Sequence, residues 1–337
     1  MKLLWKMFFI FASLVGINNK TEQVSDGIYA RSYVVMEQNS GSILESKDCN
    51  LRRSVASVSK IMTAILAIES DNLFNAVTVG DEINTIVGSS LYLAEGTKVN
   101  VIELVYGLLL RSGNDAAVTI AKNVGGSIED FVVMMNNKAN EIGMKNTVFS
   151  NPSGLDMYDD GNISTSYDLA LLMRYCMNNE TFREINKTQT FKSSVKGTWS
   201  NKHKLIQNYE YAIGGKTGYT KKAKRTLITS ARKDDLELIV VTLDCGSDFA
   251  FHKAKFEQYF ANYTYLSFLN KGTNYILNYE IVVDKEYGII IENSKAKNIT
   301  KHYQINHKKN EVKMFLIFSD NSSIEVGKAK VISFKTI

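Results

Sequence analysis

The stretch Ser54–Ile68, SVASVSKIMTAILAI, sets the strongest limits on how this chain folds. It begins with small and hydroxyl residues and continues with apolar residues at Ile61, Ala64, Ile65 and Ile68. Spacings of three and four residues place these side chains on one face of a helix. The sequence therefore predicts a buried helix that has a serine in its first turn.

Ser57 and Lys60 form a Ser-x-x-Lys pair at the start of this helix. Because residues three apart are neighbours on a helix surface, the amine lies on the same side as the hydroxyl. Burial lowers the pKa of a lysine, and a neutral amine can accept the proton of a serine hydroxyl. On this stretch alone a second interpretation stays open, in which Ser57 caps the helix and Lys60 extends its amine to solvent.

Residues 1–26 predict a secretory signal peptide or an N-terminal anchor. Lys2 and Lys6 precede a short apolar run, Met7–Ile17, and polar residues follow it. This order is typical of an exported protein, and the run is too short for an ordinary membrane-spanning helix.

Composition excludes several classes of function. The chain has 337 residues, enough for two domains, and a formal net charge of +5 without a dense basic cluster, so we expect no nucleic-acid partner. Three distant cysteines, Cys49, Cys176 and Cys245, predict no disulfide framework. The four histidines form no His-x-His or His-Glu-x-x-His pair, so we expect no metal site.

The order of strand and helix patterns predicts an α+β fold for residues 27–270. A strand pattern at 32–37 comes first, and the chain from about 57 to 184 is mainly helical. Strand patterns follow from residue 190, and a helix pattern from about 250 to 263 comes after them. This order indicates an antiparallel sheet flanked by helices, with a helical subdomain.

Residues 271–337 predict a small all-β C-terminal domain, because short β-like runs alternate there with polar turns. The runs lie at 275–283, 288–292, 312–318 and 330–334. No basic amphipathic helix is expected near residue 337.

Two further motifs follow the Ser-x-x-Lys pair along the chain. Ser112-Gly113-Asn114 lies between two helix patterns, and Lys216-Thr217-Gly218, the only Lys-Thr-Gly of the sequence, opens a strand pattern. Ser-x-x-Lys, Ser-x-Asn and Lys-Thr-Gly are the motif set of penicillin-binding proteins and serine β-lactamases.

The chain resembles the D-alanyl-D-alanine carboxypeptidases of the low-molecular-mass penicillin-binding protein family. The resemblance includes GSSLYLAEGTKVNVIELVYGLLLRSGNDAA, MKNTVFSNPSGL, STSYDLALL and GGKTGYTKKAKRTLITSA, and it extends from about Ser32 to Asn270. It implies a β-lactamase/transpeptidase-like fold for residues 27–270. The β-rich end fits a C-terminal domain that such enzymes often have.

The resemblance implies catalytic roles for three residues. Ser57 would be the nucleophile, Lys60 its base, and Ser112 a proton relay to the leaving group. We expect these residues and Lys216 to meet within hydrogen-bond reach in one cleft.

It also implies substrate-binding roles. Asn114 would hold the substrate backbone and keep Lys60 in place, while Lys216 and the Thr217 hydroxyl would bind a free carboxylate. Gly218 would leave room for a peptide at the strand edge. The backbone N–H groups of Ser57 and Tyr219 would form the oxyanion hole.

One departure from the family pattern concerns charge. Where many members have Ala-Gly after Lys-Thr-Gly, this chain has Ala223-Lys224, and Arg225 follows. The added positive charge could dock the terminal carboxylate, dock an anionic wall polymer, or be solvated.

The resemblance implies a serine-type carboxypeptidase that removes the terminal D-alanine from peptidoglycan stem pentapeptides, with no cofactor and no metal. The stem peptide would be its substrate and β-lactam antibiotics its inhibitors. It would act in the cell wall, at the extracytoplasmic face of the bacterial membrane, and association with the outer face of that membrane stays open. A serine β-lactamase and a non-catalytic wall-binding relative are the alternatives. Gly113 in place of an aspartate argues against the first, and the intact motifs argue against the second.

Overall fold

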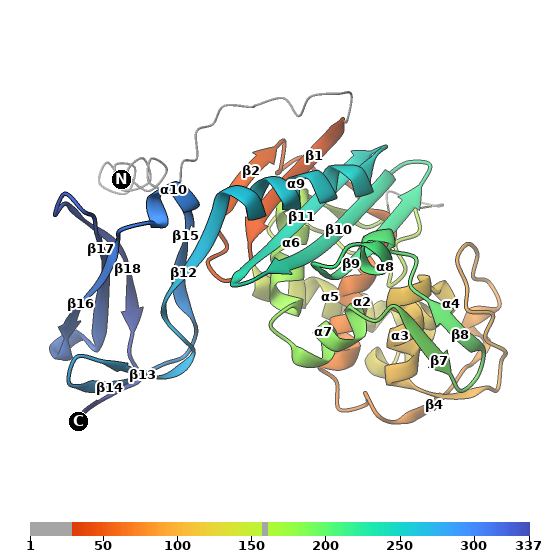
Figure 1. Ribbon diagram of the computed structural model, residues 1–337. Helices are drawn as coiled ribbons and strands as arrows, with labels where there is room; N and C mark the ends of the chain where they lie inside the picture. Colours follow the sequence, from red (N-terminus) through yellow and green to blue (C-terminus); the bar gives the residue numbers. More distant parts are fainter. Residues whose placement is uncertain (1–28, 157–160) are drawn as a thin grey trace.

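Figure 1 presents the computed structural model, which describes residues 29–156 and 161–337. A sheet packed between helices lies beside a smaller, β-rich part that the last strands form (Figure 1). The signal or anchor predicted at residues 1–26 falls outside the described residues. None of the helices in the described ranges combines the length and the apolar character needed to cross a membrane.

The central sheet is antiparallel throughout. Its strands are β1 (Ala30–Glu37), β2 (Ile43–Lys47), β9 (Ala212–Thr220), β10 (Lys224–Lys233) and β11 (Leu236–Cys245). They lie in the order β2-β1-β11-β10-β9, and every neighbouring pair is antiparallel. The predicted antiparallel sheet is confirmed, and β9 is one of its edge strands.

Both faces of this sheet are covered. In the middle strand β11, Ile239 and Val241 contact one buried cluster, and Leu238 and Val240 contact the other. Such alternation is expected of a strand with packed side chains on both faces. The predicted arrangement of helices on the faces of the sheet is therefore confirmed.

A group of helices covers the first face, and α9 (Asp248–Asn262) covers the second (Figure 1). The helices of the group are α2 (Lys60–Ile68), α3 (Val101–Arg111), α4 (Asn114–Gly125), α5 (Ile128–Ile142), α6 (Ser166–Cys176) and α7 (Glu180–Asn186). The short helix α8 (Lys204–Asn208) precedes β9.

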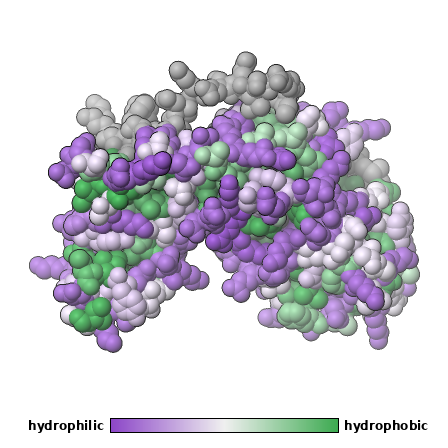
Figure 2. Space-filling model, viewed as in Figure 1, coloured by the Kyte–Doolittle hydropathy of each residue, from purple (hydrophilic) through white to green (hydrophobic). Residues whose placement is uncertain are grey.

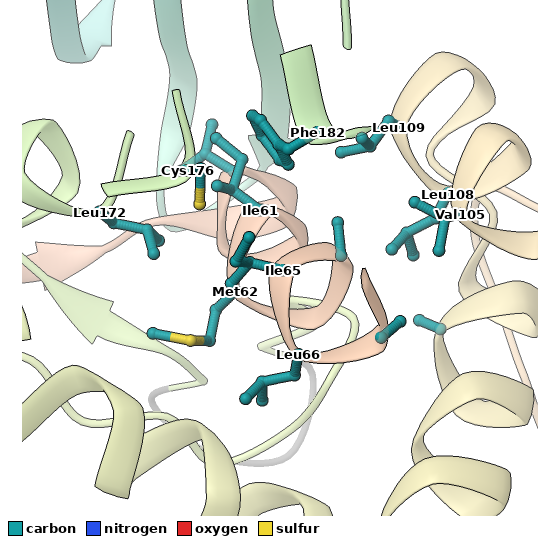
Figure 3. Packing of buried hydrophobic residues seen from close by; sticks show 14 of the residues in the cluster. Ile61, Met62, Ile65, Leu66, Val105, Leu108, Leu109, Leu172, Cys176 and Phe182 are labelled. Atoms are coloured by element: carbon teal, nitrogen blue, oxygen red, sulfur yellow. The ribbon is translucent and has the colours of Figure 1, made fainter. Parts of the chain in front are cut away.

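Helix α2 is at the centre of this group. Figure 3 shows Ile61 and Ile65 of α2 among side chains of neighbouring helices, including Leu108 of α3 and Phe182 of α7. All nine residues of α2 are buried, Lys60 among them. The sequence predicted one buried face, and the structure buries the whole circumference.

The chain enters α2 through a short 3₁₀ turn, η1 (Ala56–Ser59), and Ser57 lies in this turn rather than in the α-helix as predicted. The cause is Ala56, whose φ of +53° is a left-handed conformation that a regular helix excludes. The Ser59 hydroxyl donates to the Ala56 carbonyl at 2.9 Å and fixes the turn.

Three pairs of short strands and one 3₁₀ turn tie the remaining loops together. The pairs are β3 (Arg53–Ser54) with β6 (Ile163–Ser164), β4 (Ala76–Thr78) with β5 (Lys98–Asn100), and β7 (Thr190–Ser193) with β8 (Gly197–Ser200). The 3₁₀ turn is η2 (Asp81–Ile83).

The C-terminal strands form three small sheets with a hydrophobic cluster of their own. In the first, β12 (Tyr263–Leu269) pairs with β15 (Tyr287–Glu292). In the second, β14 (Tyr279–Val283) lies between β13 (Gly272–Ile276) and β19 (Ser333–Thr336). In the third, β17 (Glu311–Ile317) lies between β16 (Thr300–Asn306) and β18 (Ser323–Lys330). The helix α10 (Asn293–Ala296) and the turn η3 (His307–Lys309) connect strands. The predicted β-rich end is confirmed.

Details of this part differ from the prediction. The strands begin at Tyr263, before residue 271. The run 275–283 is a hairpin, because Leu277 turns the chain with φ +54°, where glycine or asparagine is usual. The run 330–334 contains the end of β18 and the start of β19.

The position of α2 predicts a large effect of shortening one of its side chains. Ile65 is fully buried, so Ile65→Ala should lower the free energy of unfolding by about 2–5 kcal/mol, through lost burial and the cavity left behind. Val133→Ala on α5, where the side chain is 56% exposed, is the matched control. Urea unfolding followed by circular dichroism measures both, and equal shifts for the two variants would contradict this account of the core.

Candidate active site

The Ser57 hydroxyl and the Lys60 amine are within hydrogen-bond distance. Lys60 Nζ donates to Ser57 Oγ at 3.0 Å, and Lys60 is fully buried while Ser57 is partly exposed. The η1 turn therefore presents the hydroxyl to solvent while α2 holds the amine beneath it.

Uncharged oxygens surround the Lys60 amine. Besides Ser57 Oγ, it donates to Asn114 Oδ1 at 2.7 Å and, over a short distance, to the Ser153 carbonyl. Burial lowers the pKa of Lys60 well below its usual range, and the charges of Lys216 and Lys202 lower it further. The second interpretation of the sequence, a cap and a solvated lysine, is therefore wrong.

The Ser153 carbonyl is held by the turn at residues 151–154. Asn151 Oδ1 accepts from the Ser153 N–H at 3.1 Å and from the Gly154 N–H at 2.7 Å. Gly154 has φ +83°, and a Cβ there would lie 2.1 Å from the Ala56 carbonyl oxygen. Only glycine allows this turn to pack directly against the η1 backbone.

Asn114 connects Lys60 to the loop before α3. Its Oδ1 accepts from Lys60, its Nδ2 donates to the Val87 carbonyl at 2.6 Å, and its backbone N–H donates to the Ser89 carbonyl at 2.7 Å. The Asn114 side chain therefore orients the Lys60 amine and fixes the loop at the same time. The contact with Lys60 is the one that we expected from the sequence.

Ser112 lies between α3 and α4 with φ +65°, a left-handed backbone that turns its side chain out of both helices. It is 6% exposed and lines the same cavity as Ser57. Within residues 29–156 and 161–337 its hydroxyl makes no hydrogen bond to Ser57 or Lys60. The structure thus places it in the cleft but not in the direct contact that we predicted.

The Lys-Thr-Gly motif lies on the edge strand β9, next to η1. A Cβ at Gly218 would lie 3.0 Å from the Ser57 backbone nitrogen, so a side chain there would cover that N–H group. Lys216 is buried and its amine donates to the Thr217 carbonyl at 2.9 Å rather than to Ser57 or Lys60. Burial, and then the charge of Lys202, lower the pKa of Lys216 to about 7.

These elements enclose a cavity of about 270 Å³. Of the predicted residues, Ser57, Ser112, Thr217, Gly218 and Tyr219 line it. The other three predicted residues, Lys60, Asn114 and Lys216, are buried and are not among the residues that line this cavity. In the described part of the chain, no three His, Cys, Asp or Glu side chains are grouped as metal ligands.

Sequence reasoning missed several residues of the wall: Ser89, Lys202, Lys204, Asp248 and Phe249. Arg225, which departs from the family pattern, also lines the cavity. Its guanidinium donates to both carboxylate oxygens of Asp248, at 2.7 and 3.1 Å, and lies 5.7 Å from the Phe249 ring centre. The charge of Arg225 is thus fixed at the cavity rather than freely solvated.

Comparison with known proteins agrees with this geometry. Residues 18–247 match the D-alanyl-D-alanine carboxypeptidase family of peptidases. The chain belongs to this family. The predicted resemblance to low-molecular-mass penicillin-binding proteins is thereby confirmed.

Individual members of the family support the assignment. D-alanyl-D-alanine carboxypeptidase DacF of Bacillus subtilis is 34% identical over 227 residues, which are 65% of this chain and 58% of that protein. The chain therefore matches less than two thirds of the length of this relative. A D-alanyl-D-alanine carboxypeptidase from Mycobacterium tuberculosis has a similar structure, with a TM-score of 0.67 and 29% identity over 72% of this chain and 95% of that chain.

The likeness extends into the C-terminal strands. Penicillin binding protein 6B from Escherichia coli has a TM-score of 0.73 and 26% identity, covering 94% of this chain and 99% of that chain. The predicted β-lactamase/transpeptidase-like fold with a β-rich C-terminal part is confirmed.

The turn at Gly154 predicts a specific effect on Ser57. Gly154→Ala should lower the rate at which a fluorescent penicillin labels the chain by at least about tenfold, because the new Cβ pushes the Ser153 carbonyl and η1 apart. Gly143→Ala is the matched control, since Gly143 has φ +88° but nothing within 4 Å of the added Cβ. Equal labelling rates in the two variants would contradict this role of the turn.

Proposed function

We propose that this chain is a serine-type D-alanyl-D-alanine carboxypeptidase that removes the terminal D-alanine from peptidoglycan stem pentapeptides. The observation that carries the proposal is the buried Lys60 amine, 3.0 Å from Ser57 Oγ and without a carboxylate among its hydrogen-bond partners. An amine kept neutral in this way can accept the serine proton at neutral pH.

The first half of the reaction forms an acyl-enzyme. Ser57 Oγ bonds to the carbonyl carbon of the penultimate D-alanine while its proton passes to Lys60 Nζ. The carbon–nitrogen bond then breaks, and the leaving amine takes that proton through the Ser112 hydroxyl, which lines the cavity. D-alanine leaves, and Lys60 is neutral again.

The second half hydrolyses the ester. Water attacks the acyl carbon and gives its proton to Lys60, and Ser57 Oγ recovers a proton as the shortened peptide leaves. The Ser57 and Tyr219 N–H groups would hold the carbonyl oxygen in both halves. The space that Gly218 leaves at the Ser57 nitrogen supports this assignment.

The cations around the cavity suit a substrate with a free C-terminal carboxylate. Lys216 and Thr217 would bind it, as the motif implies, and Lys202 adds positive charge to the same cavity, where Asp248 neutralises Arg225. Asn114 would also hold the substrate backbone. β-Lactam antibiotics would acylate Ser57 and act as inhibitors.

We propose further that residues 1–26 direct export or anchor the chain, that residues 27–270 carry catalysis, and that residues 271–337 are a separate small β domain. The protein would then act in the cell wall, on the outer face of the cytoplasmic membrane. The charge and apolar pattern of residues 1–26 supports export.

The decisive experiment uses a synthetic stem pentapeptide and mass spectrometry. We expect the wild-type chain to release one alanine, and Ser57→Ala to release none, because the acyl acceptor is then missing. Ser70→Ala, which removes a hydroxyl that donates to the Ala67 carbonyl just beyond the other end of α2, is the control and should retain activity. Release of alanine by Ser57→Ala at the wild-type rate would reject the proposal.

Two groups set the expected pH dependence of kcat/KM, which reports the free enzyme. Activity should rise with pH as Lys60 loses its proton, and fall as pH rises through about 7, where Lys216 loses the charge that binds the carboxylate. A pentapeptide with a C-terminal amide has no carboxylate for Lys216 to bind. For this substrate, the decline of kcat/KM above about pH 7 should therefore be absent. Identical pH profiles for the acid and amide substrates would contradict the role of Lys216.

A further inference from the structure

A second cavity lies between the turn that joins β1 to β2 and the C-terminal strands. Its volume is about 280 Å³, and it shares no lining residue with the cavity at Ser57. One wall consists of Asn39, Ser40 and Ser42 of the turn with Arg174 of α6, and the other of residues from β12, β15, β17, β18 and the loop before β15. Figure 1 shows β12 and β15 next to the sheet that contains β1 and β2, and Figure 2 shows mainly hydrophilic side chains where the two parts meet.

The Tyr265 hydroxyl is an unsatisfied polar group in the wall of this cavity. Tyr265 is only 4% exposed, and its hydroxyl oxygen is buried without a hydrogen-bond partner among the described residues. The nearby Asn39 side chain donates to Glu286 Oε2 at 3.1 Å instead. Because a buried hydroxyl without a partner is destabilising, this group points to a ligand that supplies the missing hydrogen bond.

Gly288 makes room for this hydroxyl. A Cβ at Gly288 would lie 2.5 Å from Tyr265 Oη, so the phenol ring extends across the backbone of β15. Gly288 and Asn39, which surround the hydroxyl, both line the cavity. The hydroxyl therefore faces the cavity rather than the hydrophobic interior.

Positive charge predominates in the wall. Arg174, Lys285 and Lys328 line the cavity, and Glu286 is the one acid among the described lining residues. The ion pairs in the described part of the chain include neither Arg174 nor Lys285. Lys328 lies 4.0 Å from Glu325, but Glu325 also pairs with a second lysine. The cavity therefore favours an anionic ligand.

Arg174 is held in position by the turn. Its Nε donates to the Gln38 carbonyl and its Nη2 to the Asn39 carbonyl, both at 2.7 Å, and neither bond uses Nη1. Glu37 accepts from the Asn39 and Ser40 N–H groups, so its carboxylate is directed at the turn backbone. A fixed guanidinium with N–H groups to spare suits a phosphate or a carboxylate.

The remaining wall suits a hydroxylated carbon skeleton. Ser42 and Glu286 offer polar oxygens, while Phe268, Met314 and Val326 offer apolar surface. A volume of about 280 Å³ is at the lower end for ligand sites, which suits a molecule of the size of one sugar ring.

We propose that this cavity binds an anionic sugar, carboxylated or phosphorylated. Arg174, Lys285 and Lys328 bind the anionic group, and the Tyr265 hydroxyl and Glu286 bind sugar hydroxyls. A free sugar anion and a sugar acid within a wall polymer offer the same chemistry. Either ligand would contact the catalytic part and the C-terminal strands together, and neither depends on the reaction at Ser57.

Calorimetric titration of the full chain in 150 mM NaCl tests the proposal with four probes. We expect galacturonate or galactose 6-phosphate to bind, and neutral galactose to bind at least about tenfold more weakly, because it lacks the anionic group. Trigalacturonate that binds at least as tightly as the monomer would assign the site to a polymer, and binding of the monomer alone would assign it to a free sugar anion. Binding of neither anion, or equal binding of galactose, would overturn the proposal.

Substitutions locate the binding. Tyr265→Phe removes only the hydroxyl and should weaken binding of the anionic sugar at least about fivefold. Tyr209→Phe is the matched control, because the Tyr209 hydroxyl is also buried without a partner in the described ranges but Tyr209 does not line this cavity.

A pair of lysine substitutions tests the charge. Lys285→Gln with Lys328→Gln should weaken binding of the anionic sugar at least about tenfold, whereas Lys192→Gln with Lys196→Gln on the β7–β8 hairpin should leave it unchanged. Affinity that is unchanged by Tyr265→Phe or by the Lys285 and Lys328 pair would overturn the proposal. Labelling by a fluorescent penicillin on the same samples reports folding and Ser57 independently, so loss of sugar binding is distinguishable from loss of the fold or of the proposed activity.

Discussion

The catalytic part depends on the burial of one amine. Lys60 has no exposed surface, and a buried amine without hydrogen-bond acceptors would be strongly destabilising. Its hydrogen-bond partners come from the preceding turn η1, with Ser57, and from two segments distant in the sequence, α4 with Asn114 and the turn with Ser153. Because none of them is charged, the amine is not held as a cation: when neutral, it donates its two N–H groups to the Asn114 and Ser153 oxygens and accepts from the Ser57 hydroxyl. The fold must therefore bring three segments to one point, and the sheet and helices around α2 do so.

Two glycines follow from the same constraint. At Gly154 the turn backbone approaches the Ala56 carbonyl, and at Gly218 the edge strand β9 approaches the Ser57 nitrogen. In both places a Cβ would occupy space between two backbones. One glycine allows an acceptor to reach Lys60, and the other leaves the Ser57 N–H open toward the cavity. Both glycines are required because they have no Cβ. Their role therefore becomes clear only from the packing of the segments in the structure.

The sequence predicts what depends on side-chain type and misses what depends on the backbone. Apolar periodicity predicted the mainly helical stretch from about 57 to 184, which holds α2 to α6, and motif order identified Lys60 as part of the site. Ser153 acts through its carbonyl, which every residue has, so no pattern could single it out. Lys202 belongs to no motif and reaches the cavity only through the path of the chain before α8. The hairpin at Leu277 was missed because leucine gives no turn signal.

Three lysines near one cavity explain how a base and a carboxylate-binding cation coexist. The charges of Lys216 and Lys202 disfavour a proton on Lys60, and Lys202 disfavours one on Lys216. A pKa of about 7 for Lys216, against an ordinary 10.5, disfavours its charged form by about 5 kcal/mol. A bound carboxylate reverses much of this effect, because it favours the proton on Lys216. Charge on Lys216 in turn opposes a proton on Lys60, so the cation that binds the substrate carboxylate also helps to keep the base neutral.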